Sequence, residues 1–158
     1  MELVFLKAKQ RLAKEISNKG TTPYPLTKNF TSEHIQISKS KKGLHDLLKH
    51  LQTQAASGAC LHKGLLKRPL INESRAMMAD HVASTELLIL DIDGIQMPNR
   101  SVIDVNVRTI SEQIIAQLPE CFQDISYIAQ ASASLGLKKD KISLHLFFLL
   151  EQPTQPKI

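Results

Sequence analysis

Residues 86–94 read Glu-Leu-Leu-Ile-Leu-Asp-Ile-Asp-Gly, an apolar run that leads into two carboxylates and a glycine. The run over 86–92 predicts a buried β-strand, and we expect Gly94 to end it. Because side chains alternate along a strand, Asp91 and Asp93 are expected on the same face. Like charges beside a buried strand are costly to desolvate, and a hard divalent cation such as Mg²⁺ or Mn²⁺ would remove that cost. The alternative is an exposed strand end, where Asp91 acts as a cap and Asp93-Gly94 forms a turn.

The second informative stretch is the segment Lys141–Leu150. A strand here places Lys141, Ser143 and His145 on one face. Its other face is apolar, formed by Ile142, Leu144, Leu146, Phe148 and Leu150. An ammonium, a hydroxyl and an imidazole can all donate hydrogen bonds, so such a row suits phosphate oxygens. The alternative is an amphipathic edge strand whose polar face meets water.

Around these two strands, the hydrophobic spacing predicts the remaining elements. Helices are expected over 2–18, 44–56 and 106–118, with a short helix capped by Asn72 and running through Ala79. Further strands are expected over 59–63 and 125–131, and the Pro-rich tail is expected to be loose. The order predicts one mixed α/β (α+β) domain over 1–152 with a largely antiparallel sheet. It consists of an N-terminal helical part (1–57) and a sheet-bearing part (58–152), followed by a tail (153–158).

Composition limits the class of protein. The chain has 158 residues, 42% hydrophobic and 22% charged, which excludes collagen-like, coiled-coil and strongly disordered classes. Its apolar runs are shorter than the roughly 20 residues that a membrane-spanning helix needs, so no membrane partner is expected. The first residues do not resemble a signal peptide, and Cys60 and Cys121 form no paired motif. We therefore expect a cytoplasmic protein without disulfides.

Charge is unevenly distributed along the chain. Residues 1–80 hold 14 Lys and Arg against 6 Asp and Glu, whereas residues 81–158 hold 6 against 9. A basic half joined to an acidic half suits an enzyme that acts on nucleic acid, with lysines for phosphates and carboxylates for metal ions. Lysine-rich surfaces are also common in proteins that bind no nucleic acid.

The two motifs together resemble the archaeo-eukaryotic primase superfamily, in particular the primase-polymerase domains of phages, plasmids and integrating elements. That family has a strand-borne DxD, which Asp91-Ile92-Asp93 matches, and then a strand-borne SxH, which Ser143-Leu144-His145 matches. Lys141 matches a lysine often found two residues before that serine. The segment from Leu70 to Ala76, which includes Arg75, is similar to the one that precedes the DxD strand in mobile-element members. The resemblance covers residues 60–152 and is faint before them.

The resemblance implies two-metal nucleotidyl transfer on an RRM-like palm. Asp91 and Asp93 would hold Mg²⁺ or Mn²⁺, and Ser143, His145 and Lys141 would bind the triphosphate of a (d)NTP. Arg75 and the Lys138-Lys139 loop would touch template or triphosphate, although solvated surface charge is the simpler interpretation of the two lysines. Single-stranded or primer-template DNA would follow the basic half of the chain.

One departure from the family concerns its third motif, a hydrophobic residue followed by a carboxylate, which should come after the SxH strand. The sequence ends 13 residues past His145, and only Leu150-Glu151 follows, in the same strand. Asp104 and Asp124 lie before SxH and are in the wrong order. We therefore expect a metal site short of one carboxylate, through truncation or because the chain is a half-domain that works with another chain. A helicase or a further domain, supplied C-terminally or by another chain, is an expected partner.

Two other functions fit parts of the sequence. One is a non-catalytic remnant that binds nucleotides or single-stranded DNA without polymerising. The other is a phosphatase of the haloacid-dehalogenase type, in which a DxDG motif supplies a nucleophile and an acid–base. That family needs a later lysine and an acidic pair, and no DD or GDxxxD follows here.

Overall fold

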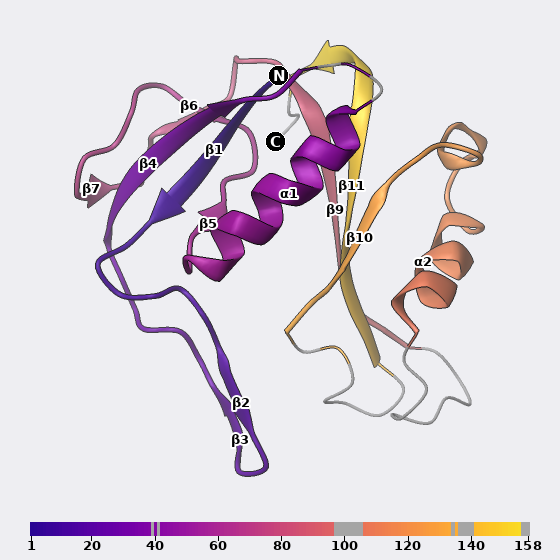
Figure 1. The fold of residues 1–158 in the computed structure, drawn as a ribbon, viewed down its shortest axis with the longest axis horizontal. Coiled ribbons are helices and arrows are strands. Elements are labelled where there is room, and N and C mark those ends of the chain that lie inside the picture. The colour runs from indigo at the N-terminus through magenta and orange to yellow at the C-terminus, as the bar shows by residue number, and fades with distance from the viewer. Residues whose placement is uncertain (39, 41, 97–105, 134, 136–140, 156–158) are drawn as a thin grey trace. The chain divides into compact units, whose positions relative to one another are not determined.

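A computed structural model describes residues 1–38, 40, 42–96, 106–133, 135 and 141–155. The protein is a mixed α/β fold with several antiparallel sheets (Figure 1). Its contacts group the chain into two compact units, residues 1–87 with the segment from Leu150 on, and Leu88–Leu149. Each unit is described by itself, and the single domain expected from the sequence stays a prediction. None of the described helices is long and apolar enough to cross a membrane.

The first unit is built around β1 (Glu2–Lys7), the second strand of a four-stranded sheet with order β5-β1-β4-β7. The other strands of the sheet are β4 (Asn29–Gln36), β5 (Cys60–Leu61) and β7 (Glu73–Ser74). A buried cluster forms on it from Val4, Leu6, Phe30, Leu66 and Leu70. Two separate pairs complete the strands of this unit, β2 (Glu15–Ser17) with β3 (Gly20–Thr22) and β6 (Leu65–Leu66) with β8 (Ala79–Asp80).

Helix α1 (Gly43–Ala56) confirms the helix expected over 44–56, and its Leu47 is fully buried. The helix expected over 2–18 is wrong, because β1 and β2 occupy that stretch. Four consecutive residues of β1, Leu3 to Leu6, are buried, and a short apolar run of this kind fits a central strand as well as a helix. The N-terminal part is therefore mainly strand, with one helix.

The short helix expected from Asn72 is also wrong. Asn72 and Met77 have φ values of 50° and 60°, which lie in the left-handed region and break a right-handed helix. Strands β7 and β8 and the turn between them replace it. The strand expected over 59–63 is confirmed in a shorter form as β5.

The second unit is a three-stranded sheet with order β10-β11-β9 and one helix against it. Its elements are β9 (Thr85–Gln96), α2 (Val107–Ile115), the 3₁₀ helix η2 (Glu120–Phe122), β10 (Ile128–Ala131) and β11 (Lys141–Thr154). The first residues of β9 and the last residues of β11 are counted with the first unit. The predicted strands and the predicted helix over 106–118 are confirmed, with shifted ends. Asn106 begins α2, because its side-chain oxygen accepts from the N–H groups of Arg108 and Thr109.

Two predicted strand ends are wrong. Gly94 does not end β9, which continues to Gln96; at φ +70° this glycine has the conformation of a bulge residue that lets a strand bend and continue. The tail begins later than expected, because β11 runs to Thr154 and Gln155 Nε2 donates to the carbonyl of Val82 at 3.0 Å. Residues 156–158 of the expected tail lie outside the described residues.

Candidate functional site

The two motifs lie on one face of the second unit's sheet. On its other face, alternate residues of β11 pack with α2 in a buried cluster, formed by Ile110, Ile114, Ile115, Ile142, Leu144, Leu146 and Phe148. Because side chains alternate, that packing leaves Ser143 and His145 on the face away from α2. Leu90 and Ile92 of β9 also pack against the cluster, which leaves Asp91 and Asp93 on the same face as Ser143 and His145. The core thus determines which way all four polar side chains point.

Ser143 connects the two motifs directly. Its hydroxyl donates to Asp93 Oδ1 at 2.7 Å and accepts from the backbone N–H of Gly94 at 3.2 Å. The serine is only 6% exposed, whereas Asp93 is exposed. A hydroxyl-to-carboxylate bond of this length is charge-assisted and stronger than a neutral one. Asp93 is therefore held in place by a buried partner on the neighbouring strand.

A second contact joins the other pair of motif residues. His145 Nε2 lies 3.2 Å from Asp91 Oδ1, and the two side chains are 33% and 48% exposed. This contact is an ion pair when the imidazole is protonated. Residue number rises along β9 as it falls along β11, since 91 meets 145 and 93 meets 143. The two strands are therefore antiparallel neighbours here, and the motifs meet in register.

Sequence reasoning missed the contribution of β10 to this face. Gln130 is the antiparallel partner of His145 and therefore lies beside it on the same face, where it is exposed. Just beyond the strand, the backbone N–H of Ser132 donates to the carbonyl of Ser143 at 3.0 Å. The only signal in the sequence was the alternation in Ile-Ala-Gln-Ala, which is too short to identify a functional glutamine. The polar face therefore spans all three strands.

The remaining predicted residues are placed differently. Lys141 is exposed, and strand alternation puts it on the same face as Ser143. Lys138 and Lys139 lie outside the described residues. Arg75 belongs to the first unit, where its guanidinium lies 5.5 Å from the ring centre of Phe30. Its predicted contact with nucleotide or template stays a prediction.

Burial is the main cause of the shifted pKa values of two titratable groups in the first unit, Cys60 and His62. Burial raises the pKa of the Cys60 thiol, and the nearby Arg75 charge partly opposes this. Burial also lowers the pKa of His62, because the charged imidazole is disfavoured away from water, while a hydrogen bond to the Gly64 carbonyl opposes the shift. Burial thus explains both pKa shifts, and the raised pKa of Cys60 does not indicate a reactive thiol.

The carboxylates suit a metal ion that takes most of its ligands from elsewhere. Within the described ranges, no group of three or more His, Cys, Asp or Glu side chains is arranged to hold a metal ion. Asp91 and Asp93 are exposed, and Oδ1 of each already contacts the neighbouring strand. Mg²⁺ is commonly bound by one or two carboxylates together with waters and substrate phosphates. The residues present therefore fit an ion delivered with a triphosphate better than a resident structural metal.

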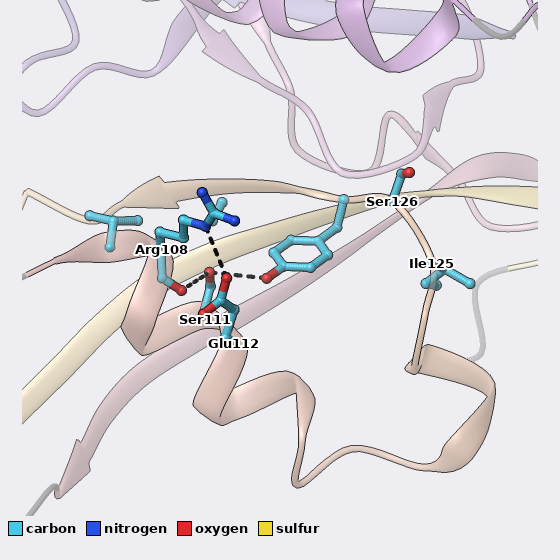
Figure 2. A pocket seen from close by; sticks show the side chains of 8 residues that line it. Arg108, Ser111, Glu112, Ile125 and Ser126 are labelled. Carbon is cyan, nitrogen blue, oxygen red and sulfur yellow. Dashed lines mark hydrogen bonds and ion pairs between the residues drawn. The ribbon is translucent and has the colours of Figure 1, made fainter.

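A separate pocket of about 530 Å³ lies beside α2, lined by Val107, Arg108, Ser111, Glu112, Ile125, Ser126, Tyr127 and Ala129 (Figure 2). Its polar side chains largely satisfy one another: Arg108 Nε donates to Glu112 at 3.0 Å, and the hydroxyls of Ser111 and Tyr127 lie 3.2 Å apart. None of the predicted site residues lines it. We therefore assign the candidate site to the opposite face of the sheet.

The first unit contains a hydrogen-bonded series with the order of a nucleophile and its base. Ser32 Oγ lies 2.9 Å from His34 Nε2, and His34 Nδ1 lies 2.6 Å from Glu2 Oε1. The hydroxyl oxygen also accepts from the backbone N–H of Leu70 at 2.9 Å, and Leu70 is fully buried. The Leu70 backbone therefore occupies one side of the Ser32 hydroxyl. The three side chains act as hydrogen-bond partners for one another and for the backbone at the edge of the first unit's core.

Comparison of the chain with protein-family models, curated proteins and solved structures finds no match. The resemblance to primase-polymerases therefore depends on the motifs and on their arrangement in this fold.

Proposed function

We propose that the chain is a nucleotidyltransferase of the primase-polymerase type, which transfers a nucleotide from a (d)NTP to a primer or initiating nucleotide on a DNA template. The observation that carries the proposal is the pairing of the two motifs across β9 and β11. Ser143 contacts Asp93 at 2.7 Å and His145 contacts Asp91 at 3.2 Å, although about 50 residues separate the motifs. On this proposal the three-stranded sheet is part of an RRM-like palm.

Each residue of the polar face has a role suited to its chemistry. Asp91 and Asp93 would hold Mg²⁺ or Mn²⁺, which neutralises phosphate charge and orients the reacting oxygens when bound. Ser143, His145 and Lys141 would donate to phosphate oxygens of the nucleotide. Such reactions depend mainly on positioning and charge neutralisation, so paired strands backed by a core are a suitable platform.

Metal-dependent nucleotide binding tests the proposal. We expect the double variant Asp91→Ala/Asp93→Ala to weaken dATP binding in Mg²⁺ or Mn²⁺ at least about tenfold, because both proposed metal carboxylates are lost. His145→Ala should weaken dATP binding more than it weakens Mn²⁺ binding. The matched control is Glu112→Ala/Glu120→Ala, which removes two exposed carboxylates of the same unit away from the candidate face. Unchanged dATP affinity in the Asp91/Asp93 double variant would refute the assignment.

A second candidate is non-catalytic binding of nucleotides or single-stranded DNA. It is favoured by the finding that the described residues contain no group of three metal-binding side chains. Primer-extension and primer-synthesis assays over a range of Mg²⁺ and Mn²⁺ concentrations separate the two functions. Nucleotide binding without any product supports the binding function, whereas product that disappears in Asp93→Ala supports transfer. A covalent phosphoryl group on Asp91 would instead indicate a phosphatase of the haloacid-dehalogenase type.

A further inference from the structure

Residues 8–28 form an arm on the first unit, and its centre is the β2–β3 hairpin. The two strands pair antiparallel from Glu15↔Thr22 to Ser17↔Gly20 around a two-residue turn. Figure 1 shows the hairpin extending beyond the ends of β1 and β4. Every residue of both strands is exposed, so the hairpin buries no face of its own. An isolated two-stranded hairpin is only marginally stable in water. A binding partner that contacts the exposed strands would explain the role of this hairpin.

The arm has a defined base and tip. At the base, the N–H of Leu12 donates to the carbonyl of Gly58 at 3.1 Å, and Arg11 lies against Gly58 so closely that a Cβ there would be 2.3 Å from its Cγ. At the tip, Ser17 Oγ accepts from the N–H of Lys19 at 3.2 Å, and Gly20 has a φ of +124°. These contacts hold the arm at both ends without covering its surface.

Charge is concentrated on this arm. It carries five exposed cationic side chains against one carboxylate, Glu15, and so holds a net +4, half of the net +8 of residues 1–80; the five are Lys9, Arg11, Lys14, Lys19 and Lys28. Among the described residues, none of the five forms an ion pair, whereas the neighbouring Lys7 is paired with Glu33. A hollow at the root of the hairpin is lined by Arg11 and Lys14.

We infer that the arm of residues 8–28 binds the phosphate backbone of duplex DNA, with the hairpin lying in a groove. This rests on the proposed function, which supplies primer-template DNA as the partner. A two-stranded ribbon fits the major groove of B-DNA. Lys19 lies in the turn of this ribbon, and the other four cationic side chains of the arm flank it, where they can replace the counterions of the phosphates.

An anionic membrane surface is the other partner that a basic arm could meet, and the hairpin does not suit it. Binding in a membrane interface requires an apolar face that enters the acyl region. Here the tip is Ser17-Asn18-Lys19-Gly20, which is polar and cationic. The exposed apolar residues, Ile16, Tyr24 and Leu26, are spread along the arm and form no apolar tip.

The salt dependence of DNA binding tests the inference. The arm variant Lys14→Gln/Lys19→Gln removes two phosphate contacts, so the slope of log K against log salt should become shallower by about 2. Between about 50 and 200 mM salt, the full chain should lose about tenfold more affinity for a primer-template duplex than this variant loses. The matched control is Lys42→Gln/Lys49→Gln, which removes the same charge from exposed positions at the N-cap and in the middle of α1 in the same unit.

The outcomes separate the possibilities. Equal slopes in the arm variant and the control overturn the inference, because net charge alone would then explain binding. Tighter binding to a single strand than to the duplex, or arm-dependent binding only to phosphatidylserine vesicles, also overturns it. The Asp91→Ala/Asp93→Ala variant is expected to keep the DNA slope of the full chain, and the arm variant to keep Mg²⁺-dependent dATP binding. Failure of the arm is thus distinguishable from failure of the proposed active site.

Discussion

The bond between Ser143 and Asp93 gives a prediction whose size follows from the structure. Ser143→Ala removes a donor to a carboxylate at 2.7 Å and an acceptor for the Gly94 N–H at 3.2 Å. A hydrogen bond to a charged group contributes about 1.5–3 kcal/mol, and a neutral one about 0.5–1.5 kcal/mol. Because Asp93 is exposed and water replaces part of the bond, we take the lower ends. The variant should therefore lose about 2 kcal/mol of unfolding free energy.

A double-mutant cycle isolates the bond from the other effects of each substitution. Asp93→Ala, Ser143→Ala and the double variant should give a coupling energy of about 1–1.5 kcal/mol. The same cycle for Asp91 and His145 is the comparison within the site. Those side chains are 48% and 33% exposed and 3.2 Å apart, so their coupling should be below about 0.5 kcal/mol.

The assay uses the chain's own tyrosines, because it has no tryptophan and only two tyrosines. A Tyr24→Phe background leaves Tyr127, which packs 5.8 Å from Phe148 in the second unit's core, as the single reporter of that unit. In urea, a loss of 2 kcal/mol should lower the midpoint by about 1 M. Ser126→Ala, at an exposed position of the same unit, is the control. A coupling for Ser143–Asp93 no larger than that for His145–Asp91 would refute the reasoning.

Three further predictions concern the cores and the titratable groups. Leu144→Ala, at a fully buried position, should lower the unfolding free energy of the second unit by about 3 kcal/mol in urea denaturation. Ile125→Ala, at a position 42% exposed, should lower it by less than about 1 kcal/mol. Equal losses in the two variants would contradict the assigned core. Because burial lowers the pKa of His62 below its ordinary 6.5, the unfolded chain takes up a proton first as pH falls. The free energy of unfolding is therefore at its full value above pH 6.5 and falls as the pH drops below 6.5. Wild type should lose more stability than His62→Gln between about pH 7 and pH 5. Parallel pH profiles of the two proteins would show that His62 contributes none of the loss. Burial raises the pKa of the Cys60 thiol, whereas Cys121 is exposed, so iodoacetamide at about pH 8 should alkylate Cys60 about tenfold more slowly than Cys121. The variant Cys121→Ser should abolish the fast phase of alkylation. A fast phase that remains in this variant would contradict the assignment of Cys60 as the slow thiol.

Sequence predicted the elements whose hydrophobic period is clear and long enough. The leucines of α1 recur at helical spacing, and β11 alternates polar and apolar residues from Lys141 to Leu146, so the sequence predicts both elements. β1 was not, because Leu3 and Leu6 happen to be three residues apart in a run that is apolar throughout. Only pairing with β4 and β5 decides that this run is a strand, since a run buried on both faces carries no period.

The same distinction applies to the candidate site. Sequence alone determined that Asp91 and Asp93 share one face of their strand, and that Lys141, Ser143 and His145 share one face of theirs, because strand alternation is a local property of the chain. It also determined the excess of positive charge in the first half. It did not show that half of this net charge belongs to an arm, residues 8–28, built around an exposed hairpin, nor that Gln130 lies beside His145.

Tertiary structure decided which motif residues meet. The antiparallel register of β9 and β11 sets Ser143 against Asp93 and His145 against Asp91, across a gap of about 50 residues. A shift of one residue in that register would turn these side chains toward α2 and the core. No local pattern fixes such a register; it is selected by the packing of Leu144, Leu146 and Phe148 against α2 and β9, which buries apolar surface only when the polar residues face away.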